Sequence, residues 1–357
     1  MTGLTGGFVD LPSWSAPAYA RQEAFVERPA VVGTAPFELP GMLTLPRAAG
    51  RHPAAVLVHA SSRHDADETI GGVKFFKDLA WGLASSGVAV LRYEKRTHRY
   101  PQITEQPGFT VKQGVIDDVV SAVGVLAAQP EIDPARIALL GHGVGGMLAP
   151  RLAAELEDRV AAIAILAANS RQVEVVTQGQ LDYLTRLVER TPATGGPAKT
   201  DHVGRQVHTT SAQLVILRKL LERMCAPDLR PDELLFAGDM KIAGSYFLDL
   251  RTYDPFAVAR EIRVPILVGH GENDYQITMA DLAGWREGLA GRPRTQIRLY
   301  AGLNHMFVAT TGPSTPEQYL RPDHVAPILI DELAQFVAAP PEVVAGAVAG
   351  AMGEAVR

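Results

Sequence analysis

The chain lacks several features that would assign it to a common class of protein. Its single cysteine, Cys225, excludes an intrachain disulfide and a metal site built from several thiolates, and we expect it to be a small, buried, apolar side chain. No stretch approaches the ~20 continuous apolar residues of a membrane span, so no membrane partner is expected. Ala18-Tyr19-Ala20 is typical of a signal-peptidase site, but neither a basic start nor an apolar segment precedes it. The sequence therefore predicts a cytoplasmic protein.

An excess of basic charge is also absent. The 357 residues include 34 Lys and Arg against 39 Asp and Glu, a net charge of −5, which disfavours a broad nucleic-acid-binding face. The Gly-rich segment "GHGVGG" (141–146) has neither the Lys-Ser/Thr pair of a phosphate loop nor the later acidic residue of a dinucleotide-binding fold. No set of His, Asp and Glu has the spacing of metal ligands. We therefore expect no nucleic-acid partner, no cofactor and no metal.

What the chain does have is a regular alternation of short apolar runs with longer helical patterns. Such alternation predicts βα units around a mainly parallel sheet, whose buried strands lack polar residues at alternate positions, as these runs do. Upstream, "EAFVERP" (23–29) and "FELPGMLTLP" (37–46) alternate in polarity and are broken by Pro and Gly, which indicates an antiparallel hairpin at the sheet edge. The predicted strands of the sheet are 54–59, 88–93, 137–141, 161–166, 265–271 and 296–300.

The alternation stops near residue 168. Two helical patterns follow, at 173–190 and 209–225, joined by a linker rich in Pro, Gly and Thr, and no strand signal appears before residue 253. We therefore predict a helical cap over the carboxyl ends of the strands, where ligand sites of such sheets form. The Ala- and Gly-rich tail would form a terminal helix that packs on the body or on a second copy in a homodimer. The predicted domains are a core at 21–169 and 251–340, the cap at 170–250 and the tail helix at 341–357.

One strand-turn-helix segment carries the first chemical signal. In "RIALLGHGVGGMLAP" (136–150) an apolar strand leads into a Gly-rich turn and a helix-compatible run, the frame of the nucleophile elbow Gly-x-Ser-x-Gly. The central position is Gly143 instead of serine. Asp274 and His305 follow the last two predicted strands, so that elbow, acid and histidine occur in the order of α/β-hydrolases. A carboxylate that fixes the imidazole tautomer would make His305 a base near neutral pH.

These segments together resemble one superfamily. The stretches "VHASSRHDADETIGG", "DLAWGLASSGVAVLRYEKRT", "GVIDDVVSAVGVLAAQPEIDPARIALLGHGVGG", "YFLDLRTYDPFAVAREIRVPILVGHGENDYQITMADLAGW" and "LYAGLNHMF" are similar to the acyl-esterase and prolyl-oligopeptidase-like branch of the α/β-hydrolases. The resemblance covers residues 37–337. It implies an α/β-hydrolase fold, with a mainly parallel central sheet, helices on both faces and a helical cap. It also implies that Asp274 and His305 are the acid and the histidine, and that Gly143 occupies the position of the serine nucleophile.

The resemblance further implies an oxyanion hole formed by the backbone N–H of Val144 and by Ala60 and Ser61. Family esterases usually read His-Gly-Ser-Gly-Pro before Asp-Arg-Asp in this loop, whereas the chain reads "HASSRHDAD" (59–67). Departures in two parts of one pocket favour a natural change of chemistry over an engineered loss of the serine. The residues that we expect to bind substrate are Arg63, which would hold an anionic group by paired N–H bonds, Ser62, His142 and Tyr246.

Without a serine the chain cannot perform ordinary acyl-enzyme chemistry, because removing a triad serine costs about a million-fold in turnover. An Asp274–His305 base would still contribute about 10²- to 10⁴-fold. The space in front of the imidazole would hold either a water for direct attack on an ester or an acidic C–H of the substrate.

We favour the second option, which is elimination of a carboxylate such as acetate from an ester-bearing small molecule. The precedent within the superfamily is the elimination of acetate from acetylated tetronates in polyketide secondary metabolism. Two alternatives remain open. One is a serine esterase inactivated by a Ser→Gly change at position 143, and the other is a non-catalytic binding protein on the same fold.

Overall fold

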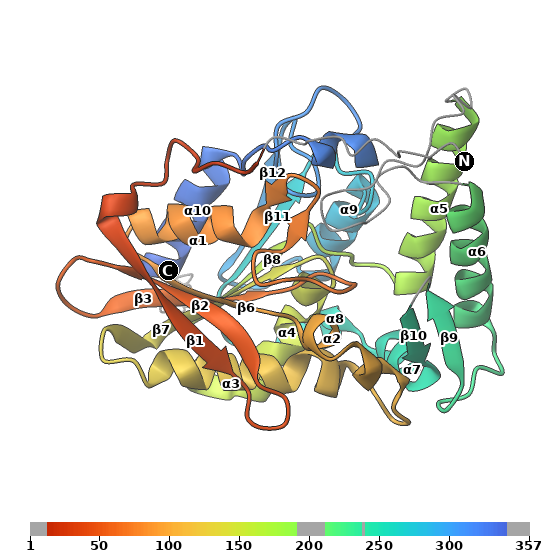
Figure 1. Cartoon of the computed structure of the whole chain (residues 1–357), viewed down its shortest axis with the longest axis horizontal. Coiled ribbons are helices and arrows are strands. Elements are labelled where there is room, and N and C mark those ends of the chain that lie inside the picture. Colours follow the sequence, from red (N-terminus) through yellow and green to blue (C-terminus); the bar gives the residue numbers. More distant parts are fainter. Residues whose placement is uncertain (1–12, 191–210, 238–239, 341–357) are drawn as a thin grey trace, which may run out of the picture.

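A central eight-stranded sheet organises the computed structural model, which describes residues 13–190, 211–237 and 240–340 (Figure 1). The strand order is β1-β2-β6-β3-β7-β8-β11-β12, with parallel pairing from β6 to β12 and an antiparallel β1–β2 hairpin at one edge. The predicted α/β-hydrolase fold class and edge hairpin are confirmed. The strands are β1 (Phe25–Val32), β2 (Leu39–Pro46), β3 (His52–Val58), β6 (Ala89–Tyr93), β7 (Ile132–His142), β8 (Ala162–Leu166), β11 (Ile266–Gly271) and β12 (Thr295–Tyr300).

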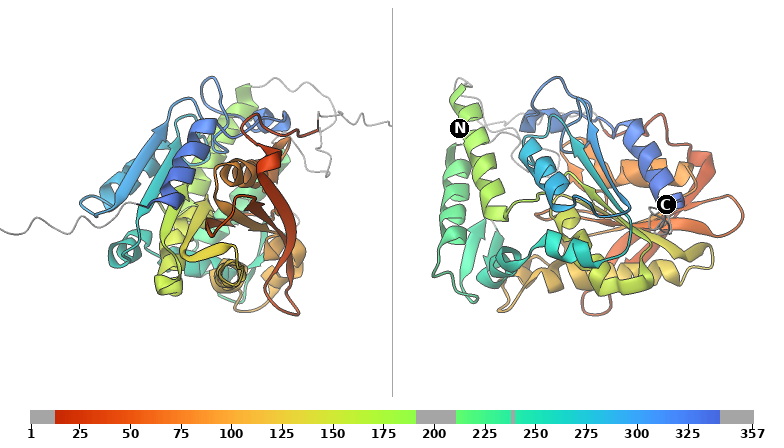
Figure 2. Two further views of the ribbon diagram at one scale, coloured as in Figure 1. Left: turned by 90° about the vertical axis from the view of Figure 1, so that its left-hand side faces the viewer. Right: turned by 180° about the vertical axis from the view of Figure 1, so that it is seen from behind.

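Helices cover both faces of the sheet, which explains why its strands are apolar throughout (Figure 2). Successive side chains of a strand point to opposite faces, and along β3 Val56 and Val58 enter one core while Ala55 and Leu57 enter the other. One core lies under α1 (Phe75–Ser85) and α10 (Pro327–Ala338), and the other under α3 (Asp117–Ala127), α4 (Val144–Leu156), α8 (Pro255–Glu261) and α9 (Met279–Gly288).

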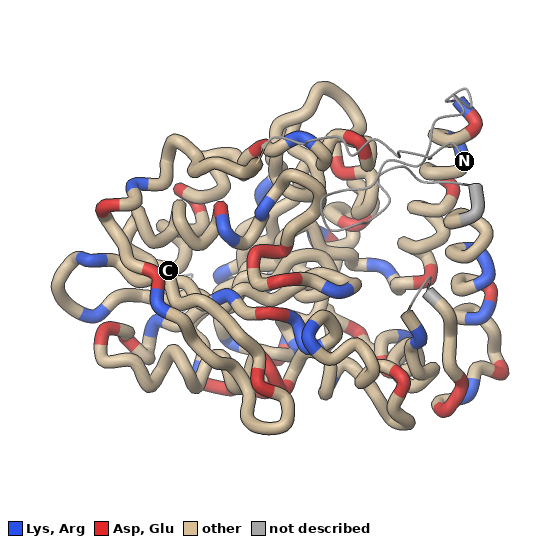
Figure 3. The backbone as a smooth tube through the Cα atoms, viewed as in Figure 1, with Lys and Arg blue, Asp and Glu red and all other residues tan. Residues whose placement is uncertain are grey.

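Short elements fill the connections. They are η1 (Gln22–Ala24), β4 (Thr69–Ile70), β5 (Val73–Lys74), α2 (Arg96–Arg99), η2 (Pro101–Glu105), η3 (Lys112–Ile116), η4 (Glu157–Arg159) and η5 (Pro316–Leu320). Figure 3 shows basic and acidic residues interspersed along the described chain, as the near balance of charge implies. Within the same residues, no helix has both the length and the apolar character needed to cross a membrane.

The segment between β8 and β11, the sixth and seventh strands of the sheet, stands beyond the sheet ends in Figure 1. Its helices α5 and α6 pack side by side. The expectation of no strand here is wrong: β9 and β10 form an antiparallel hairpin. Each strand has only four residues, too few to show a clear alternation in the sequence. The elements are α5 (Val173–Arg190), α6 (Ser211–Cys225), β9 (Leu234–Ala237), β10 (Met240–Ala243) and α7 (Gly244–Thr252).

Two other predictions concern Cys225 and the C-terminal tail. Cys225 is exposed, contrary to the prediction that it is buried; it is the last residue of α6. The predicted tail helix at 341–357 lies outside the described residues.

The start of α4 packs directly on the backbone of β3. A Cβ placed on Gly145 would lie 2.4 Å from the carbonyl oxygen of Val58 and 2.5 Å from that of His59. Only glycine allows this approach, which sets the position of the turn before α4 relative to the loop after β3.

We predict that Gly145→Ala destabilises the protein by about 1–3 kcal/mol, because the added methyl group must displace backbone atoms. Gly124→Ala in α3 is the matched control, since its Cβ would meet nothing closer than 3.7 Å. It should stabilise by about 0.4–1 kcal/mol through loss of unfolded-state freedom. Urea unfolding monitored by circular dichroism measures both values, and equal stabilities of the two variants would contradict the close approach.

Candidate active site

The residues that follow five of the strands lie at one edge of the sheet. Because β3, β6, β7, β11 and β12 run parallel, the segments after their carboxyl ends lie together. Gly143 follows β7, Asp274 follows β11 and His305 follows β12. The loop at 59–68 follows β3, and Lys95 follows β6.

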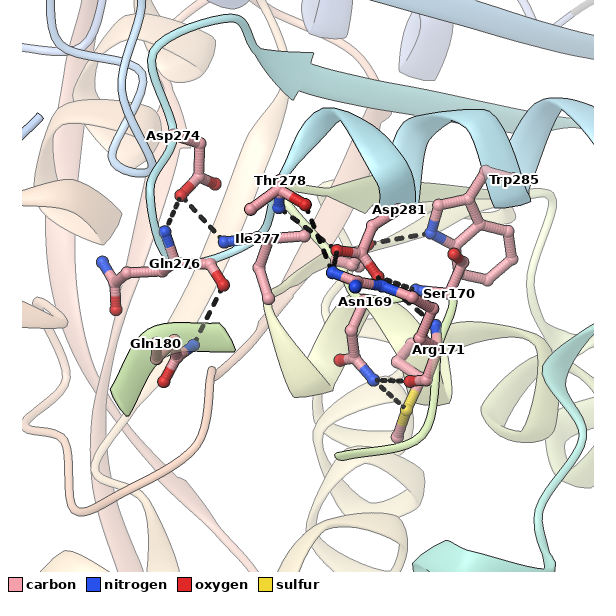
Figure 4. A network of polar contacts seen from close by, with 12 residues as sticks. Asn169, Ser170, Arg171, Gln180, Asp274, Gln276, Ile277, Thr278, Asp281 and Trp285 are labelled. Carbon is pink, nitrogen blue, oxygen red and sulfur yellow. Dashed lines mark hydrogen bonds and ion pairs between the residues drawn. The ribbon is translucent and has the colours of Figure 1, made fainter. Parts of the chain in front are cut away.

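His305 and Asp274 form a buried hydrogen-bonded pair. The His305 Nδ1 atom lies 2.7 Å from Oδ2 of Asp274, whose side chain is fully buried. The other carboxylate oxygen accepts the backbone N–H groups of Gln276 at 2.7 Å and Ile277 at 3.0 Å (Figure 4). Because Nδ1 donates to Asp274, the tautomer leaves Nε2 of His305 as a proton acceptor.

Gly143 adopts the sharp strand-to-helix turn of an elbow, with φ +53° and ψ −121°. Its N–H donates to the carbonyl of Leu166 at 2.9 Å, and its own carbonyl accepts from Met147 at 3.0 Å. A Cβ placed at position 143 would lie 4.0 Å from Nε2 of His305 and 3.1 Å from the Ala60 Cβ. A side chain at position 143 would therefore face the imidazole, and the Ala60 methyl group occupies the space beside it.

A cavity of about 570 Å³ opens in front of this arrangement. Gly143, His305 and Lys95 line one part of it, while the cap supplies an apolar part. Five further predicted site residues also line it: Ala60, Ser61, Ser62, Val144 and Tyr246. Val144 is the first residue of α4, and N–H groups in the first turn of a helix have no acceptor within the helix. This position is compatible with the oxyanion role expected for the N–H of Val144, which stays a prediction.

Two predicted substrate-binding residues, Arg63 and His142, are not among the residues that line this cavity. The backbone reverses at Ser62, where φ is +72°, and His64 Nε2 bonds back to the Ser61 carbonyl oxygen at 2.5 Å. Arg63 is not a lining residue of this cavity, so a part for it in binding an anionic group stays a prediction.

His142 lies beneath the elbow, fully buried, and the prediction that it binds substrate is wrong. Its Nδ1 atom lies 2.6 Å from Oε1 of Glu68, and its Nε2 lies 3.1 Å from the backbone oxygen of His305. The His142 and His305 rings pack with centroids 4.5 Å apart. Burial alone would lower the pKa of His142, but the Glu68 carboxylate and its hydrogen bond outweigh this effect and raise it.

Glu68 was not identified from the sequence, although its side chain is fully buried. Burial alone would raise its pKa, but the positive charge and hydrogen bond of His142 dominate and lower the pKa to about 2. The available signal was the acidic stretch "DADE" in a loop expected to form part of the pocket. His59 also supports this loop, since its Nε2 lies 3.2 Å from the Asp65 carbonyl oxygen. Burial lowers the pKa of His59 to about 3, so its ring is neutral at physiological pH.

The cap, which is the segment between β8 and β11, is hydrogen-bonded to the loop that carries Asp274. Gln180 of α5 donates its side-chain N–H to the backbone oxygen of Gln276 at 3.1 Å (Figure 4). Where the chain enters the cap, Asp281 of α9 accepts hydrogen bonds from the backbone N–H groups of Ser170 and Arg171. The Arg171 guanidinium also pairs with this carboxylate at 2.6 Å. The cap and the Asp274 loop are thus joined by direct polar contacts.

The described residues contain no group of three or more His, Cys, Asp or Glu side chains with the geometry to hold a metal ion.

An elbow, an acid and a histidine at the carboxyl edge of this sheet define the molecule as an α/β-hydrolase. The family described as serine aminopeptidase, S33, matches residues 70–310. The chain is also 34 % identical over 324 residues to esterase EstD of Thermotoga maritima, an alignment that covers 91 % of this chain and 70 % of that protein. The chain therefore belongs to this esterase-containing α/β-hydrolase family.

Two solved structures show the same fold at low sequence identity. Est1E from Butyrivibrio proteoclasticus matches with a TM-score of 0.55 at 14 % identity, over 86 % of this chain and 96 % of that one. The Pyrobaculum calidifontis esterase matches with a TM-score of 0.54 at 14 % identity, over 88 % and 85 % of the two chains. These likenesses support the fold alone.

We predict that Glu68→Gln destabilises the protein by about 3 kcal/mol, because it leaves His142 buried without its charged partner. Glu155→Gln on the exposed face of α4 is the control and should change the free energy of unfolding by less than about 0.5 kcal/mol. Urea unfolding at pH 5.5 measures both.

The effect of Glu68→Gln should depend on pH in two directions. The lowered pKa of Glu68 means that its contribution is present above the unfolded value of about 4.3 and is lost as the pH falls toward 2. The raised pKa of His142 means that its contribution is present below about 6.5 and is lost at higher pH. The stability difference from the wild type should be largest between about pH 4.5 and 6.5; a difference independent of pH would contradict a charged pair.

Proposed function

We propose that this chain is an enzyme that eliminates a carboxylate such as acetate from an ester-bearing small molecule, without a serine nucleophile. The observation that carries the proposal is the glycine opposite Nε2 of His305: a Cβ at position 143 would lie 4.0 Å from that nitrogen and 3.1 Å from the Ala60 Cβ. Among the residues that the structure describes, no hydroxyl group is hydrogen-bonded to that nitrogen. Among these residues the imidazole therefore has no hydroxyl group to activate, and it can act as a base on a bound molecule.

In the proposed reaction, Nε2 of His305 removes a proton from a carbon next to a carbonyl group. The electron pair of that C–H bond forms a carbon–carbon double bond, the adjacent C–O bond breaks, and the carboxylate leaves with the electron pair. Asp274 stabilises the imidazolium that forms. The N–H of Val144 and the loop at 60–61 would stabilise the negative charge that develops on oxygen. No covalent intermediate is required.

The contact between Gly143 and Ala60 favours a change of chemistry over an inactivated esterase. Family esterases usually have glycine where this chain has Ala60, so a serine Cβ meets no methyl group there. In this chain a Cβ at position 143 would approach Ala60 to 3.1 Å, closer than is usual for such atoms. The extra methyl group opposite the missing side chain indicates two matched changes in one pocket.

Hydrolysis by direct attack of water is the second candidate. The similarity to a protein named as an esterase favours it, and the Asp274–His305 pair could activate water in the same space. The first candidate, elimination, would give the chain a role in secondary metabolism, in tailoring polyketide or tetronate-type molecules. This role follows the precedent within the superfamily.

We predict that the chain converts an acetylated tetronate, with an acetoxymethyl group next to an acidic C–H, into an alkene and acetate. In ¹⁸O-labelled water, elimination releases unlabelled acetate, because the C–O bond breaks on the alkyl side. Hydrolysis at the acyl carbon would release labelled acetate and an alcohol, and this result would replace the elimination proposal by the second candidate. His305→Ala should slow either reaction by about 10²- to 10⁴-fold, whereas full activity of this variant would overturn the base assignment.

We also predict that serine at position 143 creates esterase activity only when room is made for it. Gly143→Ser alone is crowded by Ala60, so the double change Gly143→Ser with Ala60→Gly should hydrolyse p-nitrophenyl acetate faster than either single variant. A burst of p-nitrophenol would report the acyl-enzyme. Absence of any activity in a folded double variant would show that position 143 is not aligned with His305.

A further inference from the structure

One buried cation that lines the cavity has no hydrogen bond or ion pair to an acidic side chain among the described residues. Lys95 is 6 % exposed and lines the cavity together with Gly143 and His305. Its Nζ donates a hydrogen bond to the backbone oxygen of Ala60 at 2.5 Å. An ammonium group has three N–H donors, and among the described residues this carbonyl is the one hydrogen-bond acceptor of Nζ.

The acidic groups around Lys95 are engaged elsewhere. Glu68 is bonded to His142, and Asp118 accepts hydrogen bonds from the Arg96 guanidinium at 2.9 and 3.1 Å. Neither carboxylate forms an ion pair with Lys95 in the described structure. A buried charge without such a partner is costly, and burial lowers the pKa of Lys95 to about 8 although Glu68 and Asp118 act in the opposite sense. An anion in the cavity would relieve this cost.

The rest of the cavity shows how such an anion would lie. The polar groups of the loop after β3 lie with Lys95 and His305, whereas helices α5, α6 and α7 contribute mostly apolar side chains. These include Val176, Leu184, Leu214, Leu217, Leu220 and Phe247. Such a lining suits an apolar chain attached to a charged head group.

We propose that Lys95 binds a negatively charged group of the substrate, so that the site selects acidic molecules carrying an apolar chain. Lys95 would then bind the anionic group that the sequence analysis assigned to Arg63. This proposal rests on the proposed function for the reacting part of the substrate, but the binding of an anion by Lys95 does not depend on the reaction. The fitting chemical class is a carboxylate or an acidic enol, such as the enolate of a 3-acyl tetronic acid, with its C–H beside His305.

Binding measured by isothermal titration calorimetry on the full chain tests this proposal without any turnover. The probes are two pairs that differ in charge: octanoate with octanamide, and 3-octanoyltetronic acid with its neutral methyl enol ether. The charged member of at least one pair should bind about 10- to 100-fold more tightly than the neutral one, as expected for a charge-assisted hydrogen bond. Lys95→Gln, which keeps an N–H for the Ala60 carbonyl, should abolish that preference and leave the affinity for the neutral probe unchanged. Lys112→Gln on the exposed side of η3 is the control and should retain the preference.

The outcomes separate the two proposals. Equal affinities for charged and neutral probes, or an equal loss of both in Lys95→Gln, would overturn the anion site and leave Lys95 as a support for the Ala60 loop. If octanoate binds through Lys95 while the tetronic acid does not, the anion site stands and the tetronate-type substrate fails. If the tetronic acid binds through Lys95 but its acetoxymethyl derivative yields labelled acetate in ¹⁸O-labelled water, the anion site stands and elimination fails.

Discussion

Three loops of the site are held together by one buried ion pair, Glu68 with His142. Glu68 belongs to the loop after β3, His142 ends β7 directly before the elbow, and Nε2 of His142 contacts the backbone of His305 in the loop after β12. These loops carry the proposed oxyanion donors, the elbow and the proposed base. Both side chains are fully buried. A shift of one loop would separate the pair and leave an unpaired charge in the protein interior, which costs several kcal/mol. The pair therefore fixes the relative positions on which the chemistry depends.

The site thus contains two carboxylate–imidazole pairs with separate tasks. Asp274 and His305 leave one ring nitrogen facing the cavity, so this pair can accept a proton from a bound molecule. Glu68 and His142 have both ring nitrogens of the histidine bonded within the protein, so this pair has no capacity left for a substrate. The two rings pack against each other, and the closed pair supports the open one. The difference lies in burial and hydrogen bonding, since the residue types are nearly the same.

The sequence predicted the sheet well because strands buried on both faces must be apolar. The short apolar runs at 54–59 and 265–271 are typical of such strands. It also predicted that Gly143, Asp274 and His305 lie at one edge, since parallel strands end there. It could not predict which loop residues face the cavity. Lys95 lines it and Arg63 does not, and the positive φ at Ser62, directly before Arg63, is not evident from the sequence. The hairpin of β9 and β10 was missed for a related reason, because four-residue strands carry too few side chains for a period to show.

Glycine at the elbow is compatible with an enzyme because the turn and the nucleophile are separable properties. The φ of +53° at Gly143 is a conformation that glycine adopts more easily than serine, so the elbow persists without its hydroxyl group. A protein that only bound a ligand would gain nothing from burying Asp274 against His305 and directing the free nitrogen into a cavity. Burying a carboxylate costs free energy unless its hydrogen bonds are satisfied, and three donors satisfy Asp274 here. This arrangement, with Gly143 opposite Nε2 and the Ala60 methyl group beside it, is compatible with the proposed base that acts directly on its substrate.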